Sequence, residues 1–304
     1  MGKLTWRAKR LAQLAARSEI ADTSHGPIEF ARSGSPPYVM HLHGTPGGYD
    51  QSIPLGTPFI EAGMGSISVS RPGYLRTPIS VGRTAAEQSD AFAALLDYLH
   101  IERVAVQGVS GGGPSAVQFA ARHPDRTSAL LLTCAVSGAY PIVIPAWSKL
   151  LMTSLGMRIG EWMFSKFPQI MVKQLIGEES TYSTDELKHV TERVMGDPRL
   201  LEFLQGMTQT STPWEDRQQG FDNDIEVIRA VSEDPLPLEA VRCPTLIMHG
   251  TADDDVPYGV AVQAHERIRE SELHTMEDAC HLLWIDQGIE EMNQRQVEFL
   301  RAHA

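Results

Sequence analysis

Residues 104–122 read VAVQGVSGGGPSAVQFAAR. The stretch begins with an apolar, β-branched run that is typical of a buried strand, and it ends in a helical pattern. Between the two, GVSGG at 108–112 matches GxSxG in the strand-turn-helix setting that this motif requires. Gly108 and Gly112 supply the room that so tight a turn needs on either side of the serine. The pattern predicts that Ser110 holds its hydroxyl above the edge of a sheet, although an ordinary glycine turn has the same composition.

Other short apolar runs are also followed by helical patterns, which predicts strand-helix-strand units in series. One intervening helix is marked by a capping box, formed by Thr84 and Glu87. Such units require a parallel sheet with helices on both faces, which is the α/β class. The other predicted strands are 38–42, 67–70, 129–133, 245–248 and 273–276.

A serine hydroxyl is a weak nucleophile until an imidazole takes its proton, and the imidazole needs a carboxylate that fixes its tautomer. After a GxSxG serine, the acid and then the histidine follow along the chain, each in a loop at the carboxyl end of a strand. The sequence HGTADDDVP at 249–257 follows one predicted strand, and DACHLLW at 278–284 follows the next. We therefore predict that His281 is the base.

Three adjacent aspartates compete for the role of the acid. Asp253 is our prediction because it occupies the acidic position of GxxDxxV counted from Gly250. Asp255 remains the alternative, and it would otherwise pair elsewhere or shape the turn. Asp254 is expected to face solvent.

Acyl transfer also needs donors that stabilise a tetrahedral oxyanion, and backbone amides are suited to this task. The predicted strand at 38–42 leads directly into HGTPGG at 43–48, whose proline and glycines can fix a loop with its amides pointing inward. We predict an oxyanion hole made of the amides of Thr45 and Gly111. His43 is expected to organise this loop.

Together with RPGY at 71–74, the motifs quoted above resemble those of the α/β-hydrolases, and the resemblance spans residues 26–303. It implies an eight-stranded, mostly parallel sheet, a cap inserted after the sixth strand and attack by Ser110 without a cofactor or a metal. Dehalogenases and epoxide hydrolases of this family carry an aspartate where Ser110 stands, which counts against both activities. Cys280 replaces the glycine that usually precedes the family's histidine, and we expect it to be a small packing residue.

These features favour a serine hydrolase that cleaves small, largely apolar carboxylic esters, with an acyl-enzyme on Ser110. The same triad would serve a peptidase of the proline-iminopeptidase type, a lactonase or a C–C bond hydrolase. Proline iminopeptidases have a similar HGGPG loop, but their serine motif differs from GVSGG. A non-catalytic ligand-binding protein on the same fold is the alternative from another class.

The alternation of strands and helices stops after about 137 and resumes near 241, which predicts an inserted helical cap over 138–240. The core would then comprise 26–137 and 241–304, preceded by an amphipathic helix within 1–25. A single charge in 127–157 suggests an apolar entrance to the site, and the polar segment 183–224 is expected to be exposed. Apolar cap residues that we expect to line the substrate pocket are Trp147, Met152, Trp162, Met163 and Phe167.

The composition excludes several classes of protein. The 304 residues carry a formal net charge of −12, which argues against a nucleic-acid partner. No apolar run is long enough for a membrane span, and an export signal is not supported. Three widely spaced cysteines fit a reducing cytoplasm. The expected partner is therefore a small-molecule ester, and a homo-oligomer is compatible with the sequence.

Overall fold

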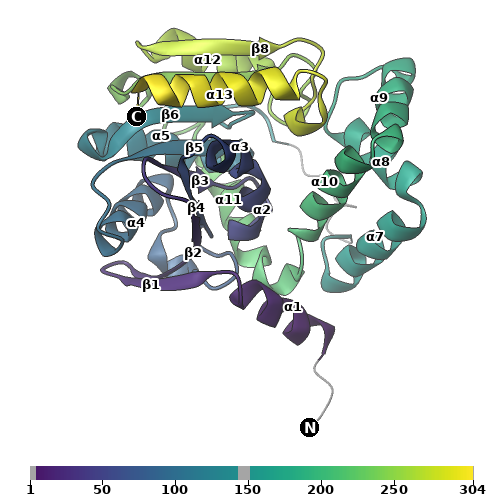
Figure 1. Ribbon diagram of the computed structural model, residues 1–304, viewed down its shortest axis with the longest axis horizontal. Coiled ribbons are helices and arrows are strands. Elements are labelled where there is room, and N and C mark those ends of the chain that lie inside the picture. Colours follow the sequence, from purple (N-terminus) through teal and green to yellow (C-terminus); the bar gives the residue numbers. More distant parts are fainter. Residues whose placement is uncertain (1–4, 143–150, 304) are drawn as a thin grey trace.

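An eight-stranded sheet forms the centre of the computed structural model, which describes residues 5–142 and 151–303 (Figure 1). The strand order is β1-β2-β4-β3-β5-β6-β7-β8. Strands β3 to β8 are parallel, whereas β2 is antiparallel to both β1 and β4. This confirms the predicted α/β class with a mostly parallel sheet of eight strands. The strands are Glu19–Thr23 (β1), Gly26–Ser33 (β2), Tyr38–Leu42 (β3), Gly65–Val69 (β4), Val104–Val109 (β5), Thr127–Thr133 (β6), Thr245–Gly250 (β7) and Ser271–Met276 (β8).

Helices pack on both faces of the sheet and separate two apolar clusters. Helices α4, α5 and α12 bury their apolar sides on one face, and α2, α3 and α13 do so on the other. The helices of the core are Tyr49–Leu55 (α2), Thr57–Glu61 (α3), Ala85–Tyr98 (α4), Gly113–Arg122 (α5), Tyr258–Arg267 (α12) and Ile289–His303 (α13). The predicted capping box at the start of α4 is confirmed, because the Thr84 hydroxyl accepts from the amide of Glu87 and the Glu87 carboxylate accepts from the amide of Thr84.

The segment between β6 and β7 contributes a helical layer of its own, of which α7 to α10 lie together beside the sheet (Figure 1). We call residues 151–240 of this insertion the cap. Its helices bury a small apolar cluster that also includes Cys280 and Ile285 of the core, so the cap packs on the loop after β8. The cap helices are Ser154–Lys166 (α7), Pro168–Glu178 (α8), Thr184–Gly196 (α9), Pro198–Gln209 (α10) and Gln218–Ala230 (α11).

The N-terminal helix is shorter than the segment 1–25 in which it was expected. Helix α1 covers Trp6–Ala15, and the chain then forms β1, which pairs with β2. The helix packs on the core and the cap, because the hydroxyl of Tyr49 donates to the carbonyl of Leu14 at 2.6 Å and Arg7 pairs with Asp216.

Two expectations about the insertion need correction. The charge-poor stretch 127–157 is not simply an apolar entrance, because its first seven residues are the fully buried strand β6. The polar segment 183–224 is not uniformly exposed either. Arg217 is 0% and Asp224 is 1% exposed, because both charges are neutralised by partners in the core.

Among the described residues, no helix combines the length and the apolar character that a membrane crossing requires.

Candidate active site

Ser110 stands on a sharp turn between β5 and α5. Its φ of 48° lies in the left-handed region, which a side chain adopts at a cost that the surrounding structure must offset. Close packing on both sides explains the neighbouring glycines. A Cβ at Gly108 would lie 2.6 Å from the Cβ of Ala116, and one at Gly112 would overlap the carbonyl oxygen of Leu42. The local sequence therefore folds into the strained turn expected of a GxSxG serine.

The loops after β7 and β8 bring Asp253 and His281 together. Nδ1 of His281 donates to Oδ2 of Asp253 at 2.8 Å, and the imidazole side chain is only 9% exposed. The other carboxylate oxygen, Oδ1, accepts from the amides of Asp255 and Val256 at 3.0 and 2.8 Å. The acid is thus held by its own turn and orients one ring nitrogen of the histidine. Asp254 is exposed.

Burial and charge act against each other in this pair. Burial alone would raise the pKa of Asp253, but the charge of His281 and hydrogen bonds from His249 and His281 hold that pKa below its usual value. Burial would lower the pKa of His281, but the carboxylates of Asp253 and Asp255, with a smaller contribution from Glu179, raise it to about 10. The resting site therefore favours a carboxylate and an imidazolium.

The second ring nitrogen of His281 faces another carboxylate. Nε2 lies 3.4 Å from Oδ2 of Asp255, whose side chain is half exposed. The hydrogen bonds among the described residues do not include one between Ser110 and His281. Strands β5 and β7 flank β6, so the loops that carry Ser110 and Asp253 start about 10 Å apart at one edge of the sheet. In free enzymes the contact between the nucleophile and its base is often long, and it tightens only when substrate binds.

Glu179, which the sequence gave no reason to select, directly follows α8 and lies beside this group. Its carbonyl accepts from the amide of His281 at 3.0 Å, and its buried Oε2 has no hydrogen-bond partner among the residues that the structure describes. Burial raises the pKa of Glu179 to about 7, although His281 opposes the shift. Ligand atoms of Glu179, Asp255 and His281 lie within 4.8 Å of one another, which is close enough to chelate a metal ion. Because the same nitrogen of His281 would have to bind the metal and accept the serine proton, we assign this set to the serine site.

The loop after β3 is built around a neutral histidine. Nδ1 of His43 donates to the carbonyl of Gly44 at 2.7 Å, and Nε2 accepts from the amide of Arg71 at 3.1 Å. Burial, reinforced by the charge of Arg71, lowers the pKa of His43 well below its usual value. The amide of Thr45 donates no hydrogen bond to a described residue. The hydrogen bonds of His43 thus hold the start of the loop in place, and the Thr45 amide is available as a donor at the position predicted for the oxyanion hole.

Cys280, next to the predicted base, is 2% exposed and belongs to the apolar cluster under the cap. Burial raises the pKa of its thiol to about 11. A thiol that stays protonated reacts slowly with alkylating reagents, which is the behaviour of the packing residue that we expected.

The apolar cap residues proposed for the pocket do not form one group. Trp162 and Phe167 are 56% and 49% exposed, and their rings meet edge to face. Met152 lines a surface pocket with Trp214 and Phe221, and Met163 is half buried. Trp147 lies outside the described residues.

Sequence reasoning missed two charged residues of the cap that contact the loop after β3. Asp224 on α11 accepts a hydrogen bond from the Thr45 hydroxyl, and Arg217 donates to the carbonyl of Gly47. The sequence pointed to Asp224 only indirectly. Arg71 of RPGY carries a charge next to a predicted buried strand, and a buried arginine needs a carboxylate partner. The core sequence does not identify that partner.

Comparisons with known proteins agree with this architecture. A family model described as alpha/beta hydrolase fold matches residues 37–287. An alpha/beta hydrolase fold protein from Nakamurella multipartita is 33% identical, superimposes with a TM-score of 0.87, and the alignment covers 94% of this chain and 100% of that one.

Two curated relatives align with nearly the whole chain. The uncharacterized hydrolase YcgS of Bacillus subtilis is 28% identical over 94% of this chain and 99% of its own. The 2-hydroxy-6-oxo-6-phenylhexa-2,4-dienoate hydrolase of Comamonas testosteroni is 24% identical over 94% and 95%. With the family model and the sheet order, these matches lead to one conclusion: the chain belongs to the α/β-hydrolase fold family.

Proposed function

We propose that the protein is a serine hydrolase that cleaves small, largely apolar carboxylic esters through an acyl-enzyme on Ser110. The observation that carries this proposal is the buried ion pair of Asp253 and His281, at the same edge of the sheet as the strained turn of Ser110. A hydroxyl, an imidazole and a carboxylate in these positions are the parts that nucleophilic acyl transfer needs.

In the acylation step, Oγ of Ser110 bonds to the ester carbonyl carbon while its proton passes to Nε2 of His281. The carbonyl oxygen becomes an oxyanion, and the amides of Thr45 and Gly111 donate to it. When the intermediate collapses, the C–O bond to the alcohol breaks and His281 returns the proton to the leaving oxygen. Asp253 keeps the other ring nitrogen protonated throughout.

Deacylation repeats these steps with water. His281 takes a proton from water as the oxygen attacks the acyl carbon, and it then gives the proton to Oγ of Ser110 as the carboxylic acid leaves. Both steps need Nε2 unprotonated at the start, so the enzyme becomes active as the pH rises toward the raised pKa of His281.

The charges beside the base support a preference for uncharged substrates. Asp255 contributes negative charge next to His281, and Glu179 adds to it above its raised pKa of about 7; like charges repel an anionic substrate. We expect a neutral diester to be hydrolysed faster than the corresponding dicarboxylate monoester. Faster turnover of the monoester would contradict this preference.

The decisive experiment compares Ser110→Ala with Ser115→Ala on p-nitrophenyl esters. Ser115 is a buried serine of the adjoining helix whose hydroxyl donates to Gln88 at 2.6 Å, so it controls for loss of a nearby hydroxyl. Ser110→Ala should lower turnover roughly 10⁴-fold or more and abolish labelling by a fluorophosphonate probe. Ser115→Ala should keep both. Retained turnover in Ser110→Ala would refute the assignment, and failure of the folded wild type to react with the probe would favour a binding protein.

C–C bond hydrolysis is the second candidate, and the Comamonas testosteroni relative supports it. The named substrate of that relative is a ketone that carries a carboxylate, with no ester or amide bond to break. The carboxylates beside His281 weigh against such an anion here. A substrate panel of esters, lactones, amides and vinylogous 1,5-diketo acids distinguishes the activities by their relative kcat/KM.

For its location we propose the cytoplasm, and the three free and buried cysteines support a reducing compartment.

A further inference from the structure

Two buried ion pairs join the core to the last part of the cap, and they run in opposite directions. Arg71 of the core pairs with Asp224 of α11 at 2.5 Å, and each side chain is 1% exposed. Arg217, which precedes α11, pairs with Asp50 of the core at 2.8 Å, with 0% and 7% exposure. Buried charges are tolerated only where hydrogen bonds satisfy them fully. The partners of these four residues therefore indicate what the pairs hold in place.

Asp224 receives four hydrogen bonds from the residues around the predicted oxyanion hole. Arg71 donates to both carboxylate oxygens, at 2.7 and 2.5 Å. The hydroxyl of Tyr74 donates to Oδ2 at 2.5 Å, and so does the hydroxyl of Thr45. The Thr45 hydroxyl thus donates to a carboxylate that belongs to the cap, and it also accepts from Nη2 of Arg71 at 3.2 Å.

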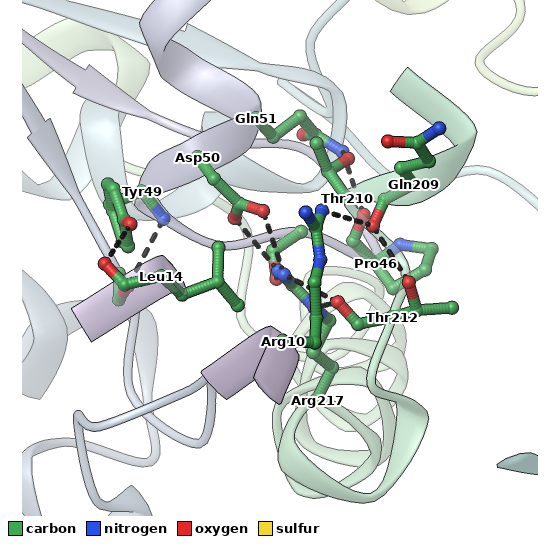
Figure 2. A network of polar contacts seen from close by, with 12 residues as sticks. Arg10, Leu14, Pro46, Tyr49, Asp50, Gln51, Gln209, Thr210, Thr212 and Arg217 are labelled. Carbon is green, nitrogen blue, oxygen red and sulfur yellow. Dashed lines mark hydrogen bonds and ion pairs between the residues drawn. The ribbon is translucent and has the colours of Figure 1, made fainter. Parts of the chain in front are cut away.

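Arg217 holds the other end of the same loop. Its Nη1 donates to the carbonyl of Gly47 at 2.6 Å. Its guanidinium also donates to the carbonyl of Thr212 and pairs with Asp50 (Figure 2). Gln51 completes the support, because its amide group donates to the carbonyl of Pro46 and accepts from the amide of Gly44, both at 2.8 Å. The backbone on both sides of Thr45 is therefore tied down.

The loop held in this way touches the second predicted donor. A Cβ built on Gly111 would collide with the Thr45 hydroxyl, so glycine at this position allows the two residues to pack directly on each other. The Thr45 side chain therefore packs against Gly111 while its hydroxyl is hydrogen-bonded to Asp224.

We propose that Asp224 and Arg217 are positioning residues that set the oxyanion hole from the cap. This inference rests on the proposed function, since it assigns a catalytic role to the Thr45 amide. Preorganised donors act because they need no rearrangement as charge develops on the substrate oxygen. Loosening the Thr45 side chain should therefore weaken binding of the transition state more than binding of the ester.

Thr45→Val tests this without breaking an ion pair, since valine has nearly the shape of threonine and leaves Arg71, Tyr74 and Asp224 in place. We expect kcat to fall about 10-fold to 100-fold with KM changed less than about threefold, because loosening a donor should cost less than the roughly 10²-fold to 10³-fold that removing one costs. Affinity for an alkyl boronic acid, whose tetrahedral adduct carries the oxyanion, should fall in parallel. Thr45→Ser keeps the hydroxyl and should restore kcat to within about threefold of wild type.

Asp224→Asn gives the second arm, measured on folded protein at a temperature below its midpoint of unfolding. Asparagine offers one acceptor where the carboxylate offers two, so kcat should fall at least as far as in Thr45→Val. Glu239→Gln breaks an exposed ion pair with Arg267 and serves as the matched control, with unchanged kcat.

The proposal is overturned if Thr45→Val lowers only the midpoint of unfolding and leaves kcat and boronate affinity at wild-type values, or if Thr45→Ser loses as much activity as Thr45→Val. A failure of the proposed function looks different. In that case the wild type hydrolyses no ester, or Ser110→Ala retains the activity.

Discussion

Asp255 lies 3.4 Å from Nε2 of His281, on the opposite side of the ring from Asp253. The base therefore has a carboxylate at each nitrogen, and the outer one occupies the nitrogen that must accept the serine proton. Both carboxylates stabilise the imidazolium before substrate arrives. The pH at which activity falls in acid should therefore depend on Asp255 as well as on Asp253.

We predict that Asp255→Asn moves the acid limb of kcat/KM to lower pH. Asp255 raises the pKa of His281, and activity needs the unprotonated ring, so removing the charge should lower the apparent pKa. The side chain is half exposed, and we expect a shift of about one pH unit. Asp254→Asn, which removes an exposed neighbouring charge, should leave the profile within about 0.3 units. If the pH profiles of Asp255→Asn and Asp254→Asn were identical, Asp255 would have no specific effect on the pKa of His281.

Asp253→Asn should lower kcat roughly 10³-fold to 10⁴-fold, because an amide does not hold the required tautomer of His281. Asp253 also accepts two backbone amides, so circular dichroism must accompany the kinetics. If Asp255→Asn were the more damaging change, the assignment of the acid would be reversed.

Two buried histidines predict a loss of stability in acid. Burial lowers the pKa of His41 to about 4 and that of His43 well below its usual value. The unfolded chain then binds more protons, so this contribution is complete above pH 6.5, the unfolded value, and is lost as the pH falls. The free energy of unfolding should fall by about 3 kcal/mol between pH 6.5 and 4 because of His41 alone.

Urea titrations of wild type and His41→Gln at pH 7 and pH 5 measure this effect. The variant should show the smaller pH dependence, whatever its absolute stability. His281 acts with the opposite sign, because its pKa is raised to about 10 and its contribution is lost as the pH rises from 6.5 toward that value. Equal acid slopes for wild type and variant would show that His41 does not titrate on unfolding.

Neighbouring aromatic residues of α7 should respond differently to truncation. Phe164 is 2% exposed within the apolar cluster of the cap, and Phe164→Ala should cost about 3–5 kcal/mol. Trp162 is 56% exposed, and Trp162→Ala should cost less than about 1 kcal/mol. A change in KM in Trp162→Ala, with unchanged stability, would support its proposed contact with substrate. Comparable destabilisation by both changes would contradict the burial of Phe164.

The fold and the candidate triad could be predicted because the chemistry restricts residue type at the ends of strands. Only small residues fit two positions to either side of Ser110, and the acid and base must follow in order. Strand β2 escaped prediction because Glu29 interrupts its apolar pattern. In the structure Glu29 is 1% exposed and pairs with Arg76 at 2.8 Å.

Asp224 and Arg217 could not be predicted for a related reason. A carboxylate and a guanidinium in a polar helical segment have the pattern of a solvated face, and burial depends on partners far away in sequence. Asp224 meets Arg71 across 153 positions, and Arg217 meets Asp50 across 167. Only packing of the cap on the core brings these charges together.

The two opposed ion pairs also define which pieces of this protein can be exchanged. A chimera that replaces the whole insertion with the lid of a relative would leave Arg71 and Asp50 without their partners and strand two charges in the interior. An exchange confined to α7, α8 and α9 would keep residues 209–230 with the loop they support. We therefore expect chimeras whose second junction lies before α10 to fold, and chimeras joined at the two ends of the whole insertion to be destabilised.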